Sequence, residues 1–292
     1  MKNLLKKIYN LNKRAYQEYK SKDCINPQTG LSERERKRLL NYPAFTEGNA
    51  DFFEKPFIFS DAHAFLHSLD EIFGGEIYRF ESGTDEPYII DCGANIGLSI
   101  FYFKKIYPNS KIVAFEPDNK IFNILQENIN GFPNSGNIQL FEEAVWTSDC
   151  ELEFYSEGTL GGSIQVDYRN TNNIIKIKAV DLKKFLNQKV DFLKIDIEGA
   201  ENEVVFDIKD SLKNVDKLFL EYHGLKNQKQ NLGEILNLLK EVGFEYYIRV
   251  AGETICFPFC NEEPSVFNQQ LNILCYRLKE KKHATNGDNS EN

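Results

Sequence analysis

The chain has no uninterrupted apolar run of the roughly 18–20 residues that a membrane-spanning helix needs. Cysteine, proline and glycine are also scarce, at 6, 9 and 18 of the 292 residues. With 41% apolar residues, this composition excludes a disulfide-bonded miniprotein, a collagen and a mostly disordered chain. The N-terminus carries three lysines but no hydrophobic segment of signal-peptide length. We therefore expect a soluble, cytoplasmic protein without a transmembrane segment.

Several functional motifs are missing as well. Neither a G-x-S-x-G nucleophile elbow nor the lysine motif of a P-loop occurs. Cys256 and Cys260 lie close together, but no second ligand pair stands nearby, so we expect reduced thiols rather than a zinc site. The net charge is −9, and the acidic body of the chain argues against nucleic-acid binding, which needs clustered cations. The basic residues gather in residues 1–40, where a solvated helix face is the favoured explanation.

The pattern of apolar residues divides the chain into three parts. Residues 1–87 form an extension with helices expected over 1–20, 31–40 and 61–73. From residue 88 to about 280, short apolar runs alternate with helical stretches, which predicts crossover units and a mostly parallel sheet. The last two apolar runs come late and suit a closing antiparallel strand. The polar tail from residue 281 onward is expected to be disordered.

The strongest motif is Y-I-I-D-C-G-A-N-I-G, which begins at Tyr88. A buried strand ends in Asp91, and a loop with Gly93 and Gly97 leads into a helix. Glycines at such a turn let the backbone approach a ligand closely. A carboxylate at Asp91 would repel a pyrophosphate, and the spacing is not the G-x-G-x-x-G of a dinucleotide site. This spacing therefore disfavours an NAD(P)-dependent oxidoreductase. A module that binds a cofactor without catalysis is a further alternative to an enzyme.

The next strand, K-I-V-A-F-E, ends in Glu116, 19 residues after Gly97. A carboxylate at this place can accept hydrogen bonds from both hydroxyls of a ribose. The other interpretation is a surface carboxylate at a strand end. Together with Asp91 and Gly93 upstream, the position of Glu116 favours a nucleoside site.

These blocks, followed by A-F-E-P-D, E-E-A-V and K-I-D-I-E-G-A-E in this order, resemble the FkbM-type S-adenosylmethionine-dependent methyltransferases. The resemblance covers about Pro87 to Gly224 and implies a doubly wound, seven-stranded α/β fold of the Rossmann-like class I type. In this chain, we expect the helical N-terminal extension to precede that fold. It implies cofactor-binding residues that run from the methionine part to the adenine in the order Asp91, Gly93, Asn95, Gly97, Glu116, Pro117, Asp118, Glu143 and Ala144. Glu143 departs from the family pattern, in which a small or amide residue is common.

The K-I-D-I-E-G-A-E block places Asp196 and Glu198 at the carboxyl end of a central strand, where open parallel sheets bind ligands. The following strand carries Glu221 and His223, which should lie beside them. Methyl transfer to a hydroxyl needs alignment and a base, so we expect Asp196, His223 and Glu198 to be catalytic. Alternatively, Glu198 only favours the N-terminus of the next helix, and His223 only caps a strand.

Asp196 with Glu221 or His223 also offers ligands for a divalent metal, but a hydrogen-bond network without metal is favoured. The glycine-rich segment 158–163 is either a lid over the cofactor or a hairpin turn.

The resemblance implies O-methylation of a small molecule, a sugar or a glycan. The first 87 residues are expected to help form the acceptor pocket. The oligomeric state stays open.

Overall fold

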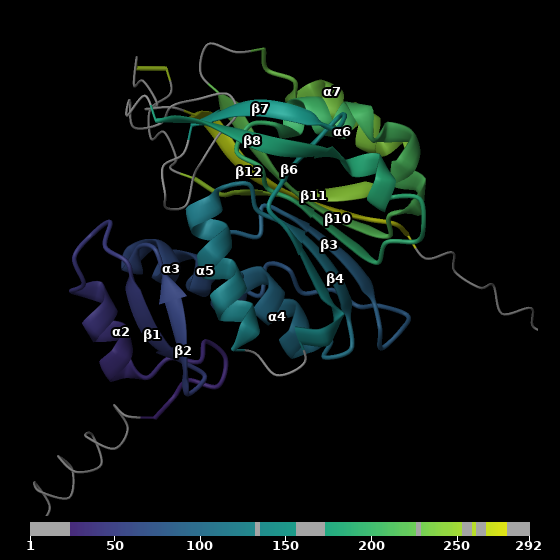
Figure 1. Ribbon diagram of the computed structural model, residues 1–292. Helices are drawn as coiled ribbons and strands as arrows, with labels where there is room; N and C mark the ends of the chain where they lie inside the picture. The colour runs from purple at the N-terminus through teal and green to yellow at the C-terminus, as the bar shows by residue number, and fades with distance from the viewer. Residues whose placement is uncertain are drawn as a thin grey trace, which may run out of the picture.

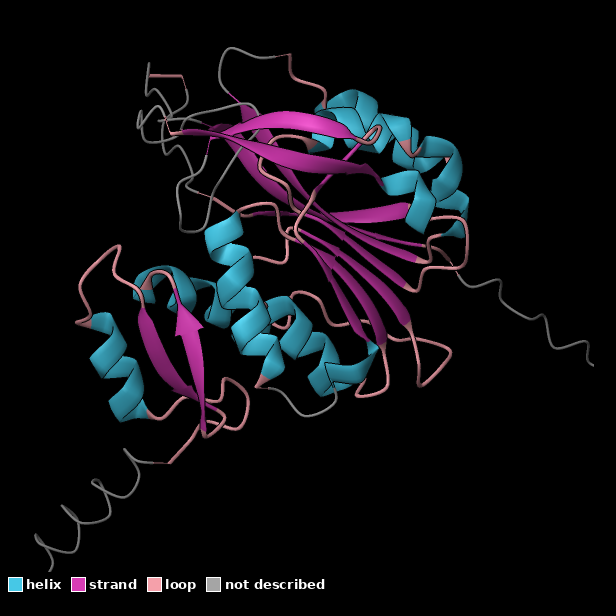
Figure 2. Ribbon diagram, in the orientation of Figure 1, coloured by secondary structure: helices cyan, strands magenta, loops and turns pink. Residues whose placement is uncertain are grey.

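The apolar runs expected from residue 88 onward form one seven-stranded sheet in the computed structural model (Figures 1 and 2). The strand order is β11-β12-β10-β9-β3-β4-β5. β12 runs antiparallel to both of its neighbours, and the other pairings are parallel. The seven-stranded, mostly parallel sheet and its closing antiparallel strand are therefore confirmed. The strands are β3 (Tyr88–Cys92), β4 (Lys111–Phe115), β5 (Ile138–Phe141), β9 (Phe192–Ile195), β10 (Lys217–Leu225), β11 (Glu245–Val250) and β12 (Phe267–Tyr276).

The structure describes residues 24–131, 135–155, 173–225, 229–252, 259–260 and 267–278. The helix expected over residues 1–20, the glycine-rich segment 158–163, Cys256 and the tail from residue 281 lie outside these ranges. Within the described ranges, no helix is both long and apolar enough to cross a membrane.

Helices cover both faces of the sheet because its strands are apolar on both sides. Ile89 and Ile90 are neighbours on β3, yet they belong to two different core clusters. The cluster around Ile89 includes residues of α4 (Leu98–Ile106) and α5 (Asn119–Asn130). The cluster around Ile90 includes residues of α6 (Glu201–Asp207) and α7 (Leu232–Glu241). Short helical turns are η1 (Asp70–Gly74), η2 (Ser135–Asn137), η3 (Leu182–Phe185) and η4 (Lys209–Asn214).

A small second sheet interrupts the alternation after β5, where the sequence predicts inserted strands. It has the order β6-β8-β7, with β6 and β8 parallel and β7 and β8 antiparallel. Its strands are β6 (Ala144–Trp146), β7 (Cys150–Tyr155) and β8 (Ile174–Asp181).

The N-terminal extension contains the expected helices α2 (Glu33–Leu40) and α3 (Ala62–Leu69), and also a hairpin that the sequence analysis did not expect. The hairpin pairs β1 (Gly48–Phe52) with β2 (Lys55–Phe59). Phe53 and Glu54 form its two-residue turn, both with positive φ, at 48° and 62°. Such turns usually carry Asn or Gly, so a Phe-Glu turn gives no recognisable signal.

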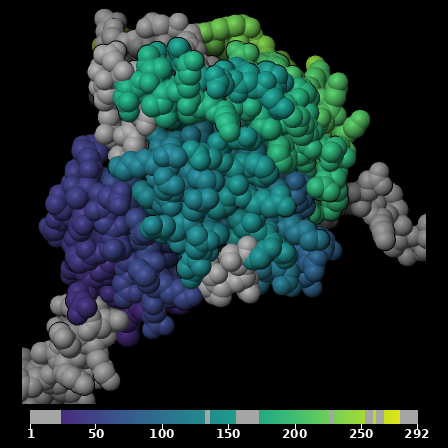
Figure 3. All heavy atoms as spheres, in the orientation of Figure 1, coloured from purple at the N-terminus to yellow at the C-terminus, as the bar shows by residue number. Residues whose placement is uncertain are grey.

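The described part of the extension shares one core with the sheet. Figure 3 shows the purple residues of the extension lying directly against the teal residues that follow. Phe57 of β2 meets Phe101 of α4 edge to face, with ring centroids 5.1 Å apart. Asn128 of α5 provides a polar link: its Oδ1 accepts from the N–H of Ile58, and its Nδ2 donates to the carbonyls of Ile58 and Ile96. The extension is thereby attached to the loop that follows β3.

Candidate active site

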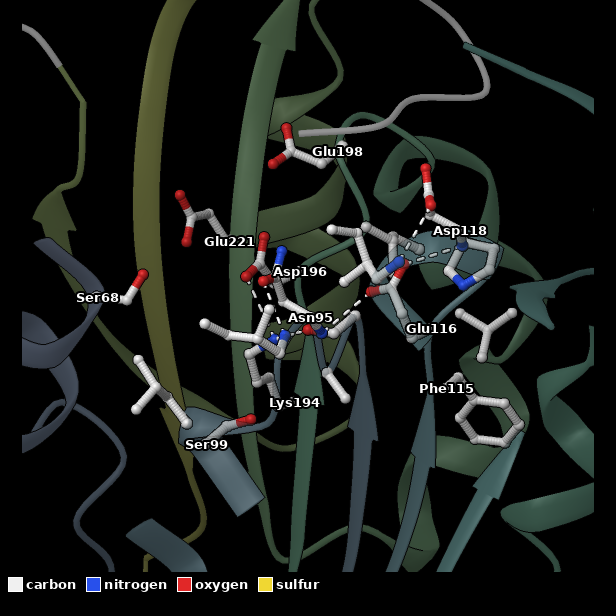
Figure 4. Close-up of a pocket in the computed structure, with 18 of the residues that line it drawn as sticks. Ser68, Asn95, Ser99, Phe115, Glu116, Asp118, Lys194, Asp196, Glu198 and Glu221 are labelled. Atoms are coloured by element: carbon white, nitrogen blue, oxygen red, sulfur yellow. Dashed lines mark hydrogen bonds and ion pairs between the residues drawn. The ribbon is translucent and has the colours of Figure 1, made fainter. Parts of the chain in front are cut away.

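A cavity of about 370 Å³ opens at the carboxyl ends of the parallel strands, within the size range of small-molecule sites. Figure 4 shows a close-up of this pocket, with residues that line it drawn as sticks. The expected site residues that line it are Gly93, Asn95, Glu116, Pro117, Asp118, Glu143, Ala144, Asp196, Glu198 and His223. The structure therefore brings ten of the twelve expected site residues to one cavity.

Position 93 requires glycine because the loop after β3 and the loop after β9 approach each other closely there. Its φ is +85°, and a Cβ built on it would lie 1.9 Å from the carbonyl oxygen of Asp196. The amides of Gly93 and Ala94 both donate to the carbonyl of Phe115, which fixes the loop after β3 against the end of β4. A residue with a side chain at position 93 would therefore push apart two loops that both line the cavity.

Asp91 and Gly97 do not line the cavity, although the sequence analysis placed both at the cofactor. Asp91 is fully buried behind the loop, where its Oδ2 accepts from Ser99 and its Oδ1 lies 3.3 Å from the ammonium of Lys194. Gly97 has φ +97° and precedes α4, and its Cα packs against Leu125. Both residues support the loop from behind, because the strand end turns Asp91 inward.

Glu116 occupies the expected position at the end of β4 and is buried. Its two carboxylate oxygens accept from the amides of Asn95 and Asp118, each at 3.0 Å. Burial raises the pKa of Glu116 to about 8, and the two amide hydrogen bonds oppose this shift. Asp118 is the N-cap of α5 and accepts from the backbone of Lys120 and Ile121.

Lys194 also lines the cavity, and the sequence analysis gave it no role. It lies on β9 with 2% of its surface exposed, between Asp91 at 3.3 Å and Asp196 at 3.2 Å. Its Nζ also donates to the carbonyl of Gly93 at 2.7 Å. A lysine inside an otherwise apolar strand is itself a signal, because a buried charge needs partners.

We expect Lys194→Met to lower the free energy of unfolding by about 3–5 kcal/mol, because it leaves buried carboxylates without their cation. Urea unfolding followed by circular dichroism measures this change. Lys209→Met is the matched control, since Lys209 pairs with Glu241 at the surface and its loss should matter little. Equal stability of the two variants would contradict the buried role of Lys194.

Glu221 and His223 project from the same face of β10, because they are two residues apart on a strand. His223 is 1% exposed, and its Nδ1 lies 3.2 Å from the Oε1 of Glu201. Its Nε2 lies 3.5 Å from Glu198 and 3.6 Å from Glu221. The fully buried Glu201 also accepts from the amides of Ile197 and Gly199, so it is held in place.

The charges around His223 determine its protonation. Burial lowers the pKa of His223, but the carboxylates of Glu201 and Glu198 outweigh this and raise it well above its usual value. Burial and the neighbouring Asp196 raise the pKa of Glu221 to about 9. These carboxylates therefore favour the protonated form of the imidazole in the ligand-free protein. The catalytic role expected for His223 stays a prediction, and the sequence alone does not show that three carboxylates surround this side chain.

The extension contributes a wall of the same cavity through α3 and the turn that follows it. His67, Ser68, Glu71 and Tyr78 line the cavity opposite the strand ends. The sequence analysis expected a pocket contribution from this segment but named no residue, because nothing in the segment indicates which helix face meets the sheet.

Comparisons with known proteins agree with this arrangement. A family model described as the methyltransferase FkbM domain matches residues 91–246, just over half of the chain. Methyltransferase sdnD of Sordaria araneosa is 29% identical over 216 residues, which cover 60% of this chain and 80% of that protein. The 2-O-methyltransferase NoeI of Sinorhizobium fredii is 23% identical over 157 residues, which cover 47% of this chain and 63% of that protein.

Among solved structures, a methyltransferase FkbM from Methylobacillus flagellatus aligns with a TM-score of 0.42 and 16% identity. This alignment covers 66% of the present chain and 45% of that chain. The matched family model spans the loop after β3, the end of β4 and the K-I-D-I-E-G-A-E block, which are the segments that build the cavity. The chain belongs to the FkbM family of methyltransferases.

Proposed function

We propose that the protein is an S-adenosylmethionine-dependent methyltransferase that methylates a hydroxyl oxygen of a small molecule or carbohydrate. The observation that carries this proposal is the joint position of Gly93 and Glu116 in one cavity with a cluster of carboxylates. The relative NoeI is a 2-O-methyltransferase, which supports oxygen as the acceptor atom.

The residues present suit the nucleoside and the methionine part of this cofactor. Two backbone amides anchor Glu116, so that its carboxylate is held at the cavity wall, ready to accept hydrogen bonds from a ribose diol. Gly93 lets the loop after β3 lie directly against the carbonyl of Asp196, and this loop lines the cavity beside Glu116. Lys194 is the one lysine or arginine that lines the cavity within the described ranges, and two carboxylates engage it. This acidic lining suits a sulfonium with an amino group better than the diphosphate of NAD(P).

When bound, S-adenosylmethionine supplies a methyl group on a sulfonium that departs as a thioether, so the protein has to align the acceptor and remove one proton. Lys194 already engages Asp196, so we assign to Asp196 the orientation of the acceptor hydroxyl. Glu198 is 23% exposed at the cavity and takes the hydroxyl proton as the new carbon–oxygen bond forms. His223, held between carboxylates, positions Glu198 and Glu221.

The acceptor is proposed to bind between the strand ends and the extension. His67, Ser68 and Glu71 provide hydroxyl, carboxylate and imidazole groups along that wall, and the ring of Tyr78 adds an apolar face. This combination is suited to a polyhydroxylated ring. The cytoplasmic location stays a prediction.

Calorimetric titration with S-adenosylmethionine tests the cofactor assignment. We expect one site per chain and no thermal shift with NAD or NADP. A folded protein that binds no S-adenosylmethionine would overturn the proposal.

The acceptor class is tested by incubation with a panel of sugars and polyhydroxylated molecules, followed by mass spectrometry for a gain of one methyl group.

Glu116→Gln is expected to weaken cofactor binding about 10–100-fold at pH 8.5, since charge-assisted hydrogen bonds contribute about 1.5–3 kcal/mol. The pKa of Glu116 is raised to about 8, so the carboxylate that accepts the ribose hydroxyls becomes populated as the pH rises. The affinity of the wild type relative to the variant should therefore increase between pH 6.5 and 8.5. Calorimetry of both proteins at each pH measures this ratio, which cancels the titration of the ligand itself. A ratio independent of pH would contradict the assignment.

A further inference from the structure

We propose that Asp196, Glu221 and His223 bind a divalent metal ion with the coordination preferences of Mn²⁺. The sequence alone favours a hydrogen-bond network at this place, but the structure adds observations that the sequence does not contain. The ion would hold an oxygen of the acceptor, and only this last role rests on the proposed function.

The backbone brings the three ligand groups together. One ligand atom from each residue lies within 4.8 Å of the others. Glu221 and His223 share a face of β10, and Asp196 follows the neighbouring parallel strand β9, in which Ile195 pairs with Leu220. The cluster is therefore set by the pairing of two central strands and not by a loop.

His223 is the second, independent observation. It is 1% exposed and lines the cavity, and its Nε2 faces the carboxylates of Glu198 at 3.5 Å and Glu221 at 3.6 Å. Its Nδ1 contacts the buried Glu201, which two backbone amides hold in turn. A carboxylate on the far nitrogen is the usual support of a metal-ligating histidine, because it orients the other nitrogen toward the ion.

Acidic side chains outnumber basic ones among the residues around this cluster. Glu71 and Glu198 line the same cavity, and Lys194 is the one lysine or arginine among its described lining residues. Figure 4 shows Lys194 and Glu221 on different sides of Asp196, so the lysine does not occupy the space toward β10. Two carboxylates and one imidazole suit Mn²⁺, which accepts both oxygen and nitrogen ligands.

The test uses the full chain after dialysis against EDTA, titrated with Mn²⁺ and followed by the electron paramagnetic resonance signal of the free ion. We expect one bound ion per chain. Glu221→Gln and His223→Asn should each weaken its binding at least 10-fold. Glu203→Gln, an exposed position on α6, should leave it unchanged. Circular dichroism shows which variants are folded.

Two results would overturn the metal site. One is a folded wild-type protein that binds no Mn²⁺ and keeps full turnover after EDTA treatment, as expected if the carboxylates instead hold an ammonium group of the acceptor. The other is unchanged Mn²⁺ affinity in both folded variants. Calorimetry with S-adenosylmethionine runs in parallel: Mn²⁺ binding without cofactor binding would overturn the proposed function and leave the metal site standing.

Discussion

Gly93→Ala is expected to abolish cofactor binding and to lower turnover at least 100-fold. The new methyl group would lie 1.9 Å from the carbonyl oxygen of Asp196, which is backbone and cannot rotate away. The φ of +85° adds strain for any residue with a side chain. Relief would require the loops after β3 and β9 to separate, and we expect a loss of about 3 kcal/mol or more in unfolding free energy. Calorimetry and urea unfolding measure the two effects.

Gly83→Ala is the matched control for this substitution. A Cβ at Gly83 meets no atom within 4 Å, and its backbone does not have a positive φ of the kind found at Gly93. The control should bind the cofactor and unfold like the wild type. Wild-type affinity in Gly93→Ala would show that the approach of the two loops is not needed for the site.

Glu198→Gln is expected to lower kcat by about 100–10,000-fold, the range of general base catalysis, while cofactor affinity changes little. The amide keeps the size of the side chain but cannot take the hydroxyl proton. The measurement is the rate of S-adenosylhomocysteine formation with an acceptor identified from the panel, together with calorimetric cofactor binding.

Glu203→Gln serves as the control here as well, because Glu203 follows the same loop but lies exposed on α6. It should retain wild-type kcat. If Glu198→Gln also retained wild-type kcat, the proton would have to go elsewhere, and the assignment of Glu198 would be wrong. A loss confined to cofactor affinity would place Glu198 at the cofactor instead.

The main sheet could be predicted because its strands carry a strong local signal. K-I-V-A-F-E and V-D-F-L-K-I-D are continuous apolar runs between helical stretches, as strands covered on both faces must be. The hairpin over Gly48–Phe59 could not be predicted, because Phe53 and Glu54 form its turn in place of the usual Asn-Gly. Phe53 and Glu54 are held at positive φ by the rest of the folded protein and not by a local preference of their own.

In the site, likewise, positions that depend on local sequence could be predicted, and contacts between distant segments could not. Glu116 and Asp196 stand at strand ends, so their place in the cavity follows from the alternating pattern. The environment of Asp91 depends on Lys194, about one hundred residues away in sequence, and it could not be read from the loop alone. The protonation of His223 likewise depends on Glu201, which reaches it only because α6 begins beneath the end of β10.

The amide of Asn128 has a consequence for protein engineering. One side chain bonds both the hairpin at Ile58 and the loop at Ile96, so the N-terminal extension and the loop after β3 are held by the same amide. Exchanging N-terminal segments between relatives would be an obvious route to a new acceptor range. A graft that ends at residue 87 would leave this amide facing a foreign backbone, so position 128 should be transplanted together with the segment.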